Sequence, residues 1–180
     1  ALGAEYRGLL GYLPQQFGYY PSYTPRQFLR YAAALQCIPK READGRIDHL
    51  LETVGLGDAA DKKMKKFSGG MLQRAAAALL LALHPRYILA DEPTSALDAE
   101  NRTLLLELLE KQRETAGILF ISHDVAALRT LCGTVHVMEH GMLTEQGTMQ
   151  ELLEHPKQAW TKEYAAANHP VSREVWTWTD

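Results

Sequence analysis

The chain has 180 residues, of which 46% are hydrophobic and 23% are charged, values that are usual for a soluble globular protein. This length suits one domain, or one domain with a small subdomain. The formal net charge of −3 argues against a nucleic acid or an anionic lipid as partner of the whole surface, and the longest apolar run (residues 75–83) is far shorter than the roughly 20 residues of a membrane helix.

The first third of the chain predicts one strand followed by helices. A short strand over residues 8–13 stops at Pro14, and Thr24 with a following proline marks a helix start. Apolar residues at helical spacing then predict a helix over residues 26–36 and a second one from Pro39 to Gly55. Because the motif Gly-Leu-Gly at residues 55–57 follows a helix, we interpret it as a C-terminal cap and not as a nucleotide loop.

The remainder of the chain predicts alternating helices and short apolar strands. Expected helices cover residues 68–83, 100–113, 125–131 and 149–154, and expected strands cover residues 87–90, 117–121, 134–138 and 141–146. Such alternation indicates an α/β fold with a parallel sheet that is covered by helices on both faces. We place a subdomain boundary near Lys66, where the all-helical part gives way to the α/β part.

The strongest chemical signal is the string YILADEPTSALD at residues 87–98. An apolar strand ends in Asp91 and Glu92, and a proline prevents its continuation. Ligands of parallel sheets bind outside the carboxyl ends of the strands. An aspartate there can hold Mg2+, usually through water, and its neighbour can orient or deprotonate an attacking water. The alternative is a strand end with two solvated acids.

A second strand delivers polar residues to the same expected edge. GILFISHD, residues 117–124, is an apolar strand followed by Ser122 and His123. A lone histidine is more often structural than functional. His123 is the exception here, because its imidazole would emerge beside the two acids and could contact a terminal phosphate.

The stretch FSGGMLQR at residues 67–74 places two glycines at the start of an apolar helix. Glycine costs about 1 kcal/mol against alanine inside a helix, so propensity does not explain this choice. At the helix start Ser68 can act as the cap, and Gly69 and Gly70 leave backbone N–H groups accessible to an anion.

Together these motifs resemble the nucleotide-binding domain of ATP-binding cassette (ABC) transporters. FSGGM resembles the signature motif, ILADE the Walker B motif, SALD the D-loop, and His123 the switch histidine. GYLPQQ resembles the Q-loop, with Gln15 the match and Gln16 the less favoured candidate. The resemblance runs from about residue 8 to residue 154, and the motifs keep the family's order and approximate spacing.

The resemblance implies the cofactors ATP and Mg2+ and a role for each site residue. Glu92 and His123 would be catalytic, Asp91 and Gln15 would hold Mg2+ through water, and Asp98 would act in the D-loop. The signature residues Ser68, Gly69, Gly70 and Met71 would meet the γ-phosphate bound by a second nucleotide-binding domain. Met71 replaces the commoner glutamine, a change that we expect to tune binding rather than abolish it.

The resemblance also implies partners, a location and a division into parts. The partners would be a second cassette and integral membrane subunits, with no nucleic acid and no direct membrane insertion, and the location would be cytoplasmic, on the inner face of the cell membrane. The absence of a cysteine framework agrees with the cytosol. The expected parts are a strand and Q-loop remnant (1–15), a helical subdomain (16–67), the ATPase core (68–155), and a C-terminal helix and tail (156–180).

The sequence departs from the family at the phosphate cradle G-x-x-x-x-G-K-[ST], since no glycine here is followed by lysine. That loop supplies backbone donors, a lysine for the phosphates and a hydroxyl for magnesium. In the family it precedes the Q-loop, so we expect the chain to be the C-terminal part of a longer P-loop NTPase. Alone it should bind ATP weakly and hydrolyse none.

Two other functions stay open at this point. One is a soluble ABC-type ATPase without membrane partners, and the other is a catalytically inactive cassette that donates its signature motif to a complete partner. The direction of transport is not assigned either. The first part of the chain resembles exporter-type cassettes, whereas the second part resembles importers of peptides or nickel.

Overall fold

The computed structural model describes residues 9–35, 37–95 and 97–168. It divides into two units, Ala1–Asp124 and Val125–Asp180, which are described one at a time. The predicted parts at residues 1–15, 16–67, 68–155 and 156–180 divide the chain at other positions, and they stay a prediction. Residues 1–8 and 169–180 of those parts lie outside the described residues.

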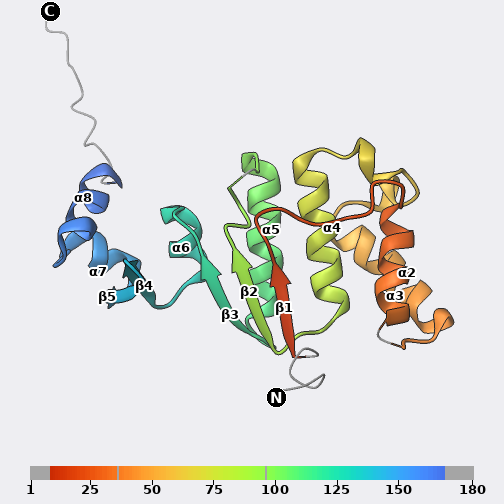
Figure 1. Ribbon diagram of the computed structural model, residues 1–180, viewed down its shortest axis with the longest axis horizontal. Helices are drawn as coiled ribbons and strands as arrows, with labels where there is room; N and C mark the ends of the chain where they lie inside the picture. The colour runs from red at the N-terminus through yellow and green to blue at the C-terminus, as the bar shows by residue number, and fades with distance from the viewer. Residues whose placement is uncertain (1–8, 36, 96, 169–180) are drawn as a thin grey trace, which may run out of the picture. The chain divides into compact units, whose positions relative to one another are not determined.

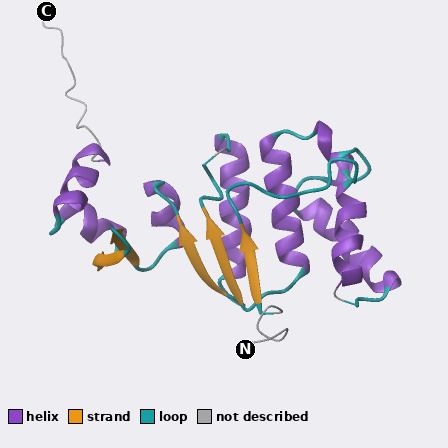
Figure 2. Cartoon of the chain, viewed as in Figure 1, coloured by secondary structure: helices purple, strands orange, loops and turns teal. Residues whose placement is uncertain are grey.

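The first unit contains a three-stranded parallel sheet in the order β1-β2-β3. Its strands are β1 (Leu10–Leu13), β2 (Tyr87–Asp91) and β3 (Gly117–Ile121). The arrows of all three strands point the same way in Figure 2. Leu13 pairs with Ala90, and Asp91 pairs with Ile121, so the three strands end at nearly the same level. The predicted α/β fold with a parallel sheet is confirmed.

The two faces of this sheet differ in burial. One face is buried and carries Ile88, Ala90 and Phe120, whereas Leu119 and Ile121 on the other face are exposed. Helix α4 (Gly69–Ala82) packs against β1 and against α5 (Ala99–Gln112). The expected helical cover is therefore found on one face within the described residues of this unit. The alternation of buried and exposed positions follows from the period of two along a strand.

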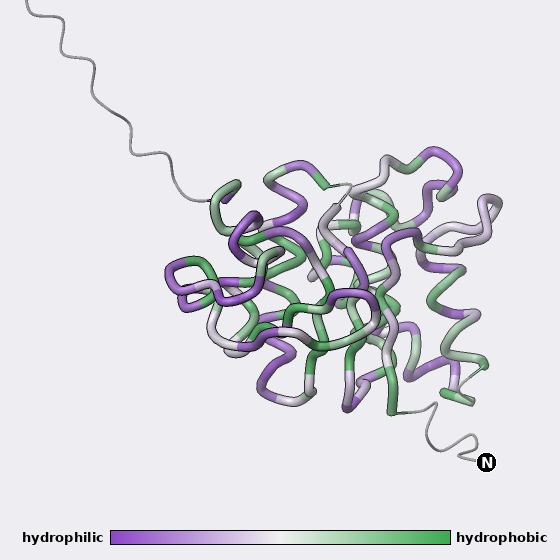
Figure 3. Tube along the Cα trace, turned by 60° about the vertical axis from the view of Figure 1, so that its left-hand side comes forward, coloured by the Kyte–Doolittle hydropathy of each residue, from purple (hydrophilic) through white to green (hydrophobic). Residues whose placement is uncertain are grey.

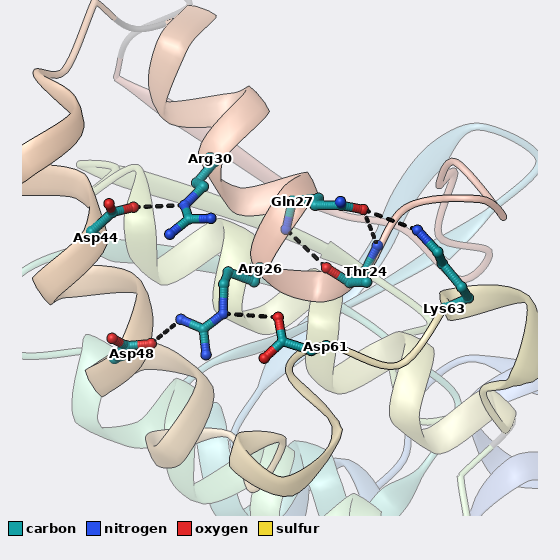
Figure 4. A network of polar contacts seen from close by, with 8 residues as sticks. All are labelled: Thr24, Arg26, Gln27, Arg30, Asp44, Asp48, Asp61 and Lys63. Carbon is teal, nitrogen blue, oxygen red and sulfur yellow. Dashed lines mark hydrogen bonds and ion pairs between the residues drawn. The ribbon is translucent and has the colours of Figure 1, made fainter.

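Helices α2 (Pro25–Leu35) and α3 (Lys40–Thr53) form a helical pair within the first unit, and both contact α4. Thr24 begins α2 as predicted, because its hydroxyl accepts the Gln27 N–H at 3.2 Å and the Gln27 carboxamide oxygen accepts the Thr24 N–H at 3.1 Å. Ion pairs join the two helices (Figure 4). The joined residues are Arg30 with Asp44 and Arg26 with Asp48, and Arg26 also pairs with Asp61.

The Gly-Leu-Gly motif ends α3, as the sequence predicts. Gly55 has a positive φ of 64°, which favours glycine. The Leu56 N–H donates to the Leu51 carbonyl at 2.7 Å, so the chain closes the last turn of the helix. Two short 3₁₀ helices, η1 (Gly57–Ala59) and η2 (Met64–Lys66), then lead to α4.

The second unit contains helix α6 (Val125–Leu131), a two-stranded sheet, and helices α7 (Met149–Glu154) and α8 (Ala159–Asn168). Its strands β4 (Val135–Glu139) and β5 (Met142–Gly147) pair antiparallel. Both strands are predicted from the sequence, but they form a separate hairpin instead of extending the parallel sheet. His140 and Gly141 have positive φ angles of 48° and 79°, as a tight two-residue hairpin turn requires.

None of the described helices is both long and apolar enough to cross a bilayer. Hydropathy changes every few residues along the trace in Figure 3, which is the pattern of elements with one buried and one exposed side.

Candidate functional site

The carboxyl ends of β2 and β3 carry the predicted acids and the predicted histidine. Asp91 is the last residue of β2 and Glu92 follows it, while His123 lies two residues beyond the end of β3. Helices α4 and α5 begin at the end of the unit toward which the strand arrows point (Figure 1). The sheet edge therefore combines titratable side chains with helix N-termini, which carry partial positive charge.

Glu92 and His123 are in direct contact. The Glu92 Oε1 atom lies 2.9 Å from Nδ1 of His123, and the side-chain exposures are 23% for the glutamate and 76% for the histidine. Glu92 has a positive φ of 44°, and its N–H donates to the Ile121 carbonyl at 2.9 Å, which fixes the turn that follows β2. Its Oε2 atom is buried and has no hydrogen-bond partner among the residues that the structure describes. A strained residue with an unsatisfied buried oxygen lowers stability, a pattern that is typical of functional sites.

Asp91 is held by the neighbouring strand. The Tyr12 hydroxyl in β1 donates to Asp91 Oδ2 at 3.3 Å. Desolvation raises the pKa of the Tyr12 phenol, and the negative charge of Asp91 and this hydrogen bond raise that pKa further. The described residues contain no group of three or more histidines, cysteines or acids that could hold a metal. The Asp91 carboxylate and the Gln15 amide oxygen are too few to hold a metal by themselves. They fit a Mg2+ ion whose other ligands are water, because magnesium takes oxygen ligands and keeps much of its hydration.

Gln15 lies beside the loop that follows β2. Its Nε2 atom donates to Ser95 Oγ at 3.3 Å, and the Ser95 hydroxyl donates to the Glu92 carbonyl at 3.0 Å. The structure thus brings Gln15 to the same edge as Glu92 through one intervening serine. The amide of Gln15 points to Ser95 in this arrangement.

The two glycines and the serine of FSGGM start α4 as the sequence predicts. The Ser68 hydroxyl accepts the Met71 N–H at 3.3 Å, so Ser68 is the N-cap. Ser68 and Gly69 are exposed, and Gly70 and Met71 are half-buried. The helix start therefore presents uncovered backbone to solvent, where an anion can approach.

Asp98 caps α5 and touches the signature region through Asn101. The Asp98 carboxylate accepts the Asn101 N–H at 2.9 Å and the Asn101 amide at 2.8 Å. The backbone bond, and after it the side-chain bonds, hold the pKa of Asp98 below its usual value. A Cβ atom on Gly70 would come within 2.8 Å of the Asn101 amide. Asn101 therefore packs closely against Gly70, so the cap of α5 lies next to the start of α4.

Two polar residues of α4 contact the loops of the site or the end of α3. Neither is among the residues predicted from the sequence. Gln73 is buried and donates from Nε2 to the carbonyls of Pro14 and Pro93. Arg74 donates from Nη1 to the Gly55 carbonyl at 2.9 Å, which ties α4 to the end of α3. Their signal in the sequence is a pair of polar side chains at the head of an otherwise apolar helix.

Comparison with known proteins identifies the family. The family model described as "ABC transporter" matches residues 3–95, which include Gln15, residues 67–71, Asp91 and Glu92. The chain therefore belongs to the ABC transporter ATP-binding family.

Individual relatives and a solved structure agree with this assignment. An uncharacterized ABC transporter ATP-binding protein, YxlF of Bacillus subtilis, is 36% identical over 81% of this chain and 50% of its own length. The methionine import ATP-binding protein MetN of Corynebacterium diphtheriae is 36% identical over 91% of this chain and 49% of its own length. A solved ATP-binding subunit of an ABC transporter superposes with a TM-score of 0.72 at 28% identity, over 82% of this chain and 62% of that one. The chain spans about half the length of the curated relatives it matches.

Proposed function

We propose that the chain is part of an ATPase subunit that couples ATP hydrolysis to transport through membrane partners. Glu92 polarises the attacking water, His123 contacts the γ-phosphate, and Asp91 with Gln15 holds Mg2+ through water. The observation that carries this proposal is the 2.9 Å contact between Glu92 and His123 at the carboxyl edge of a parallel sheet. Ligands of such sheets bind at that edge.

The signature motif completes a nucleotide site on a second cassette in this proposal. Ser68, Gly69, Gly70 and Met71 meet the γ-phosphate that the partner cassette holds, and the two cassettes lie head to tail. The exposed N-terminus of α4 supports this role, because its N–H groups and partial positive charge suit a phosphate. Asp98 acts at the same interface, since its cap packs against Gly70 through Asn101.

A second candidate is a cassette that hydrolyses nothing and only donates its signature motif. The observation that favours it is the exposed start of α4, because this role needs only the N-terminus of α4 with its cap Ser68 and no catalytic group of the chain. Under either candidate the ATP-binding partner and the membrane subunits are the expected companions, at the inner face of the membrane.

The test replaces Glu92 by glutamine in the protein as its cell makes it. We expect ATP hydrolysis to fall by orders of magnitude while ATP binding is retained, because the amide keeps the shape of the side chain but cannot take a proton. Unfolding by denaturant should show little loss of stability. The amide oxygen can keep the contact with His123 Nδ1, and the change removes a negative charge that is shared by a buried oxygen with no hydrogen-bond partner among the described residues.

The wild-type rate separates the two candidates. If the wild type hydrolyses ATP and Glu92→Gln hydrolyses it equally fast, Glu92 does not polarise the attacking water. A wild type that hydrolyses nothing alone, but accelerates a complete partner cassette in a manner that depends on Ser68, supports the signature-donating function instead.

A further inference from the structure

We propose that Gln73 is a positioning residue that holds the two loops of the site at a fixed distance from each other and from the signature helix. These are the loop after β1, which carries Gln15, and the loop after β2, which carries Glu92. The inference rests on the proposed function for its catalytic consequence, but its structural part stands on the contacts of Gln73 alone.

The Gln73 carboxamide lies between the two loops. Its side chain comes from the second turn of α4, and the residue is only 5% exposed. The Nε2 atom donates to the Pro14 carbonyl at 3.2 Å and to the Pro93 carbonyl at 3.1 Å. An amide nitrogen carries two hydrogens, so both of its donors are used. Because the group is buried, water does not compete for either bond.

The two acceptors adjoin the residues that the proposal needs in place. Pro14 directly precedes Gln15, and Pro93 directly follows Glu92. A proline has a ring-fixed φ and no N–H, so its loop loses one backbone bond and one degree of freedom. Holding the carbonyl of such a residue restrains the backbone on which the neighbouring side chain stands. Gln73 thereby restrains Gln15 and Glu92 without touching either side chain.

A second link joins the same loops on the exposed side. It runs from Gln15 Nε2 to Ser95 Oγ at 3.3 Å and on to the Glu92 carbonyl. This outer link must break if Gln15 is to turn toward a magnesium ion. The inner link through Gln73 is independent of the Gln15 side chain, so it can keep the Pro14 backbone in place while that side chain moves.

Gln73 also connects these loops to the N-terminus of α4. Ser68 caps the helix five residues earlier, and a helix transmits displacement as a rigid element. If contact with a phosphate moves the start of α4, the Gln73 side chain would transmit that movement to Pro14 and Pro93. We infer that Gln73 links the signature surface of this subunit to its own Gln15 and Glu92.

The first test measures backbone hydrogen exchange in this chain and in Gln73→Met, which keeps the volume of the side chain and removes both donors. We expect the amides of Ser95 and Leu97 in the loop after β2 to exchange about tenfold faster, while the amides of β2 stay protected. The matched control is Gln112→Met, which makes the same change at the end of α5. Unchanged loop exchange in Gln73→Met overturns the proposal. Should that variant not fold, Gln73→Asn, whose shorter amide cannot reach both carbonyls, takes its place.

The second test is a double-mutant cycle on ATP hydrolysis in the protein as its cell makes it. Gln73→Met should lower turnover by about a hundredfold with a smaller effect on KM. If Gln73 acts by positioning Gln15, the double variant with Gln15→Ala should be no slower than the slower single variant. Effects that multiply would show a merely structural role. If the wild type does not hydrolyse ATP, the proposed ATPase function is refuted. The hydrogen-exchange measurement of the first test then decides by itself whether Gln73 restrains the two loops.

Discussion

Single residues at the sheet edge and at the helix starts carry the charges of this site, and Asp98 is the one with the clearest electrostatic signature. Its carboxylate accepts the Asn101 backbone N–H and, at both of its oxygens, the Asn101 side-chain amide, and these bonds favour the charged form. The pKa of Asp98 is therefore lower in the folded chain than the value of about 3.9 that an unfolded chain shows. Its contribution to stability is complete above that value, and it is lost as the pH falls through the lowered pKa of the folded state.

Replacing Asp98 by asparagine should flatten the acid end of the stability profile. The asparagine oxygen can still accept the Asn101 N–H, so the cap persists, but the side chain no longer titrates. We expect melting temperatures measured between pH 7 and pH 3 to fall less steeply below about pH 4 than in the wild type. Glu107→Gln, on the same helix, is the control for removal of a charge. An equally steep acid loss in Asp98→Asn would contradict this account.

The sequence predicts some of these residues and misses others for a physical reason. Asp91, Glu92 and His123 lie at or just beyond the ends of apolar strands. Because parallel strands end at one edge, the position of these residues at that edge can be inferred from the order of the chain. Gln73 and Asn101 contact residues that are distant in the sequence. Gln73 contacts carbonyls that lie 59 and 20 residues away in the chain, and no local pattern encodes those partners.

At the scale of elements, the start of α4 has two tasks that can be separated by mutation. Ser68 stabilises the helix by accepting the Met71 N–H, and in the proposed function it also meets a phosphate. Ser68→Ala should lower the free energy of unfolding by about 1 kcal/mol, because the cap is lost. Ser68→Asp should keep that stability, because aspartate is an equally good cap, but it places a negative charge where the phosphate is proposed to lie.

Measurements of unfolding and of ATP hydrolysis on both variants test this separation. Ser68→Asp should be as stable as the wild type and inactive, and Ser68→Ala should be less stable and more active than Ser68→Asp. A fully active Ser68→Asp variant would exclude Ser68 from any phosphate site.

Predictions from the sequence at this scale are accurate for where elements lie and weaker for how they pair. The helix over residues 100–113 is found as α5 (Ala99–Gln112), and the strand over residues 117–121 is found unchanged. The strands over residues 134–138 and 141–146 are also found, but they pair with each other in an antiparallel hairpin. Periodicity reports which face of a strand is buried and says nothing about its neighbour. The two-residue turn His140-Gly141 was the local signal for this pairing.

At the scale of the whole molecule, the sheet of the first unit presents an apolar face to solvent. The exposed fractions of Leu119 and Tyr87 are 62% and 58%, and Leu10, Tyr12 and Ile121 are exposed on the same face. A contiguous apolar patch on a sheet with an open edge strand is a site of association.

Leu119→Thr should therefore reduce aggregation without a loss of stability. Threonine is β-branched, which suits a strand, and it removes apolar surface from the exposed face. The matched control is the neighbouring Phe120→Thr, because Phe120 is only 8% exposed and points to the buried face. Loss of this side chain should cost about 3 kcal/mol or more and should increase aggregation. Light scattering of the chain during storage, together with denaturant unfolding, measures both quantities. If Leu119→Thr aggregates as fast as the wild type, association does not proceed through this face, because the strand alternation leaves Leu119 as its most exposed apolar residue.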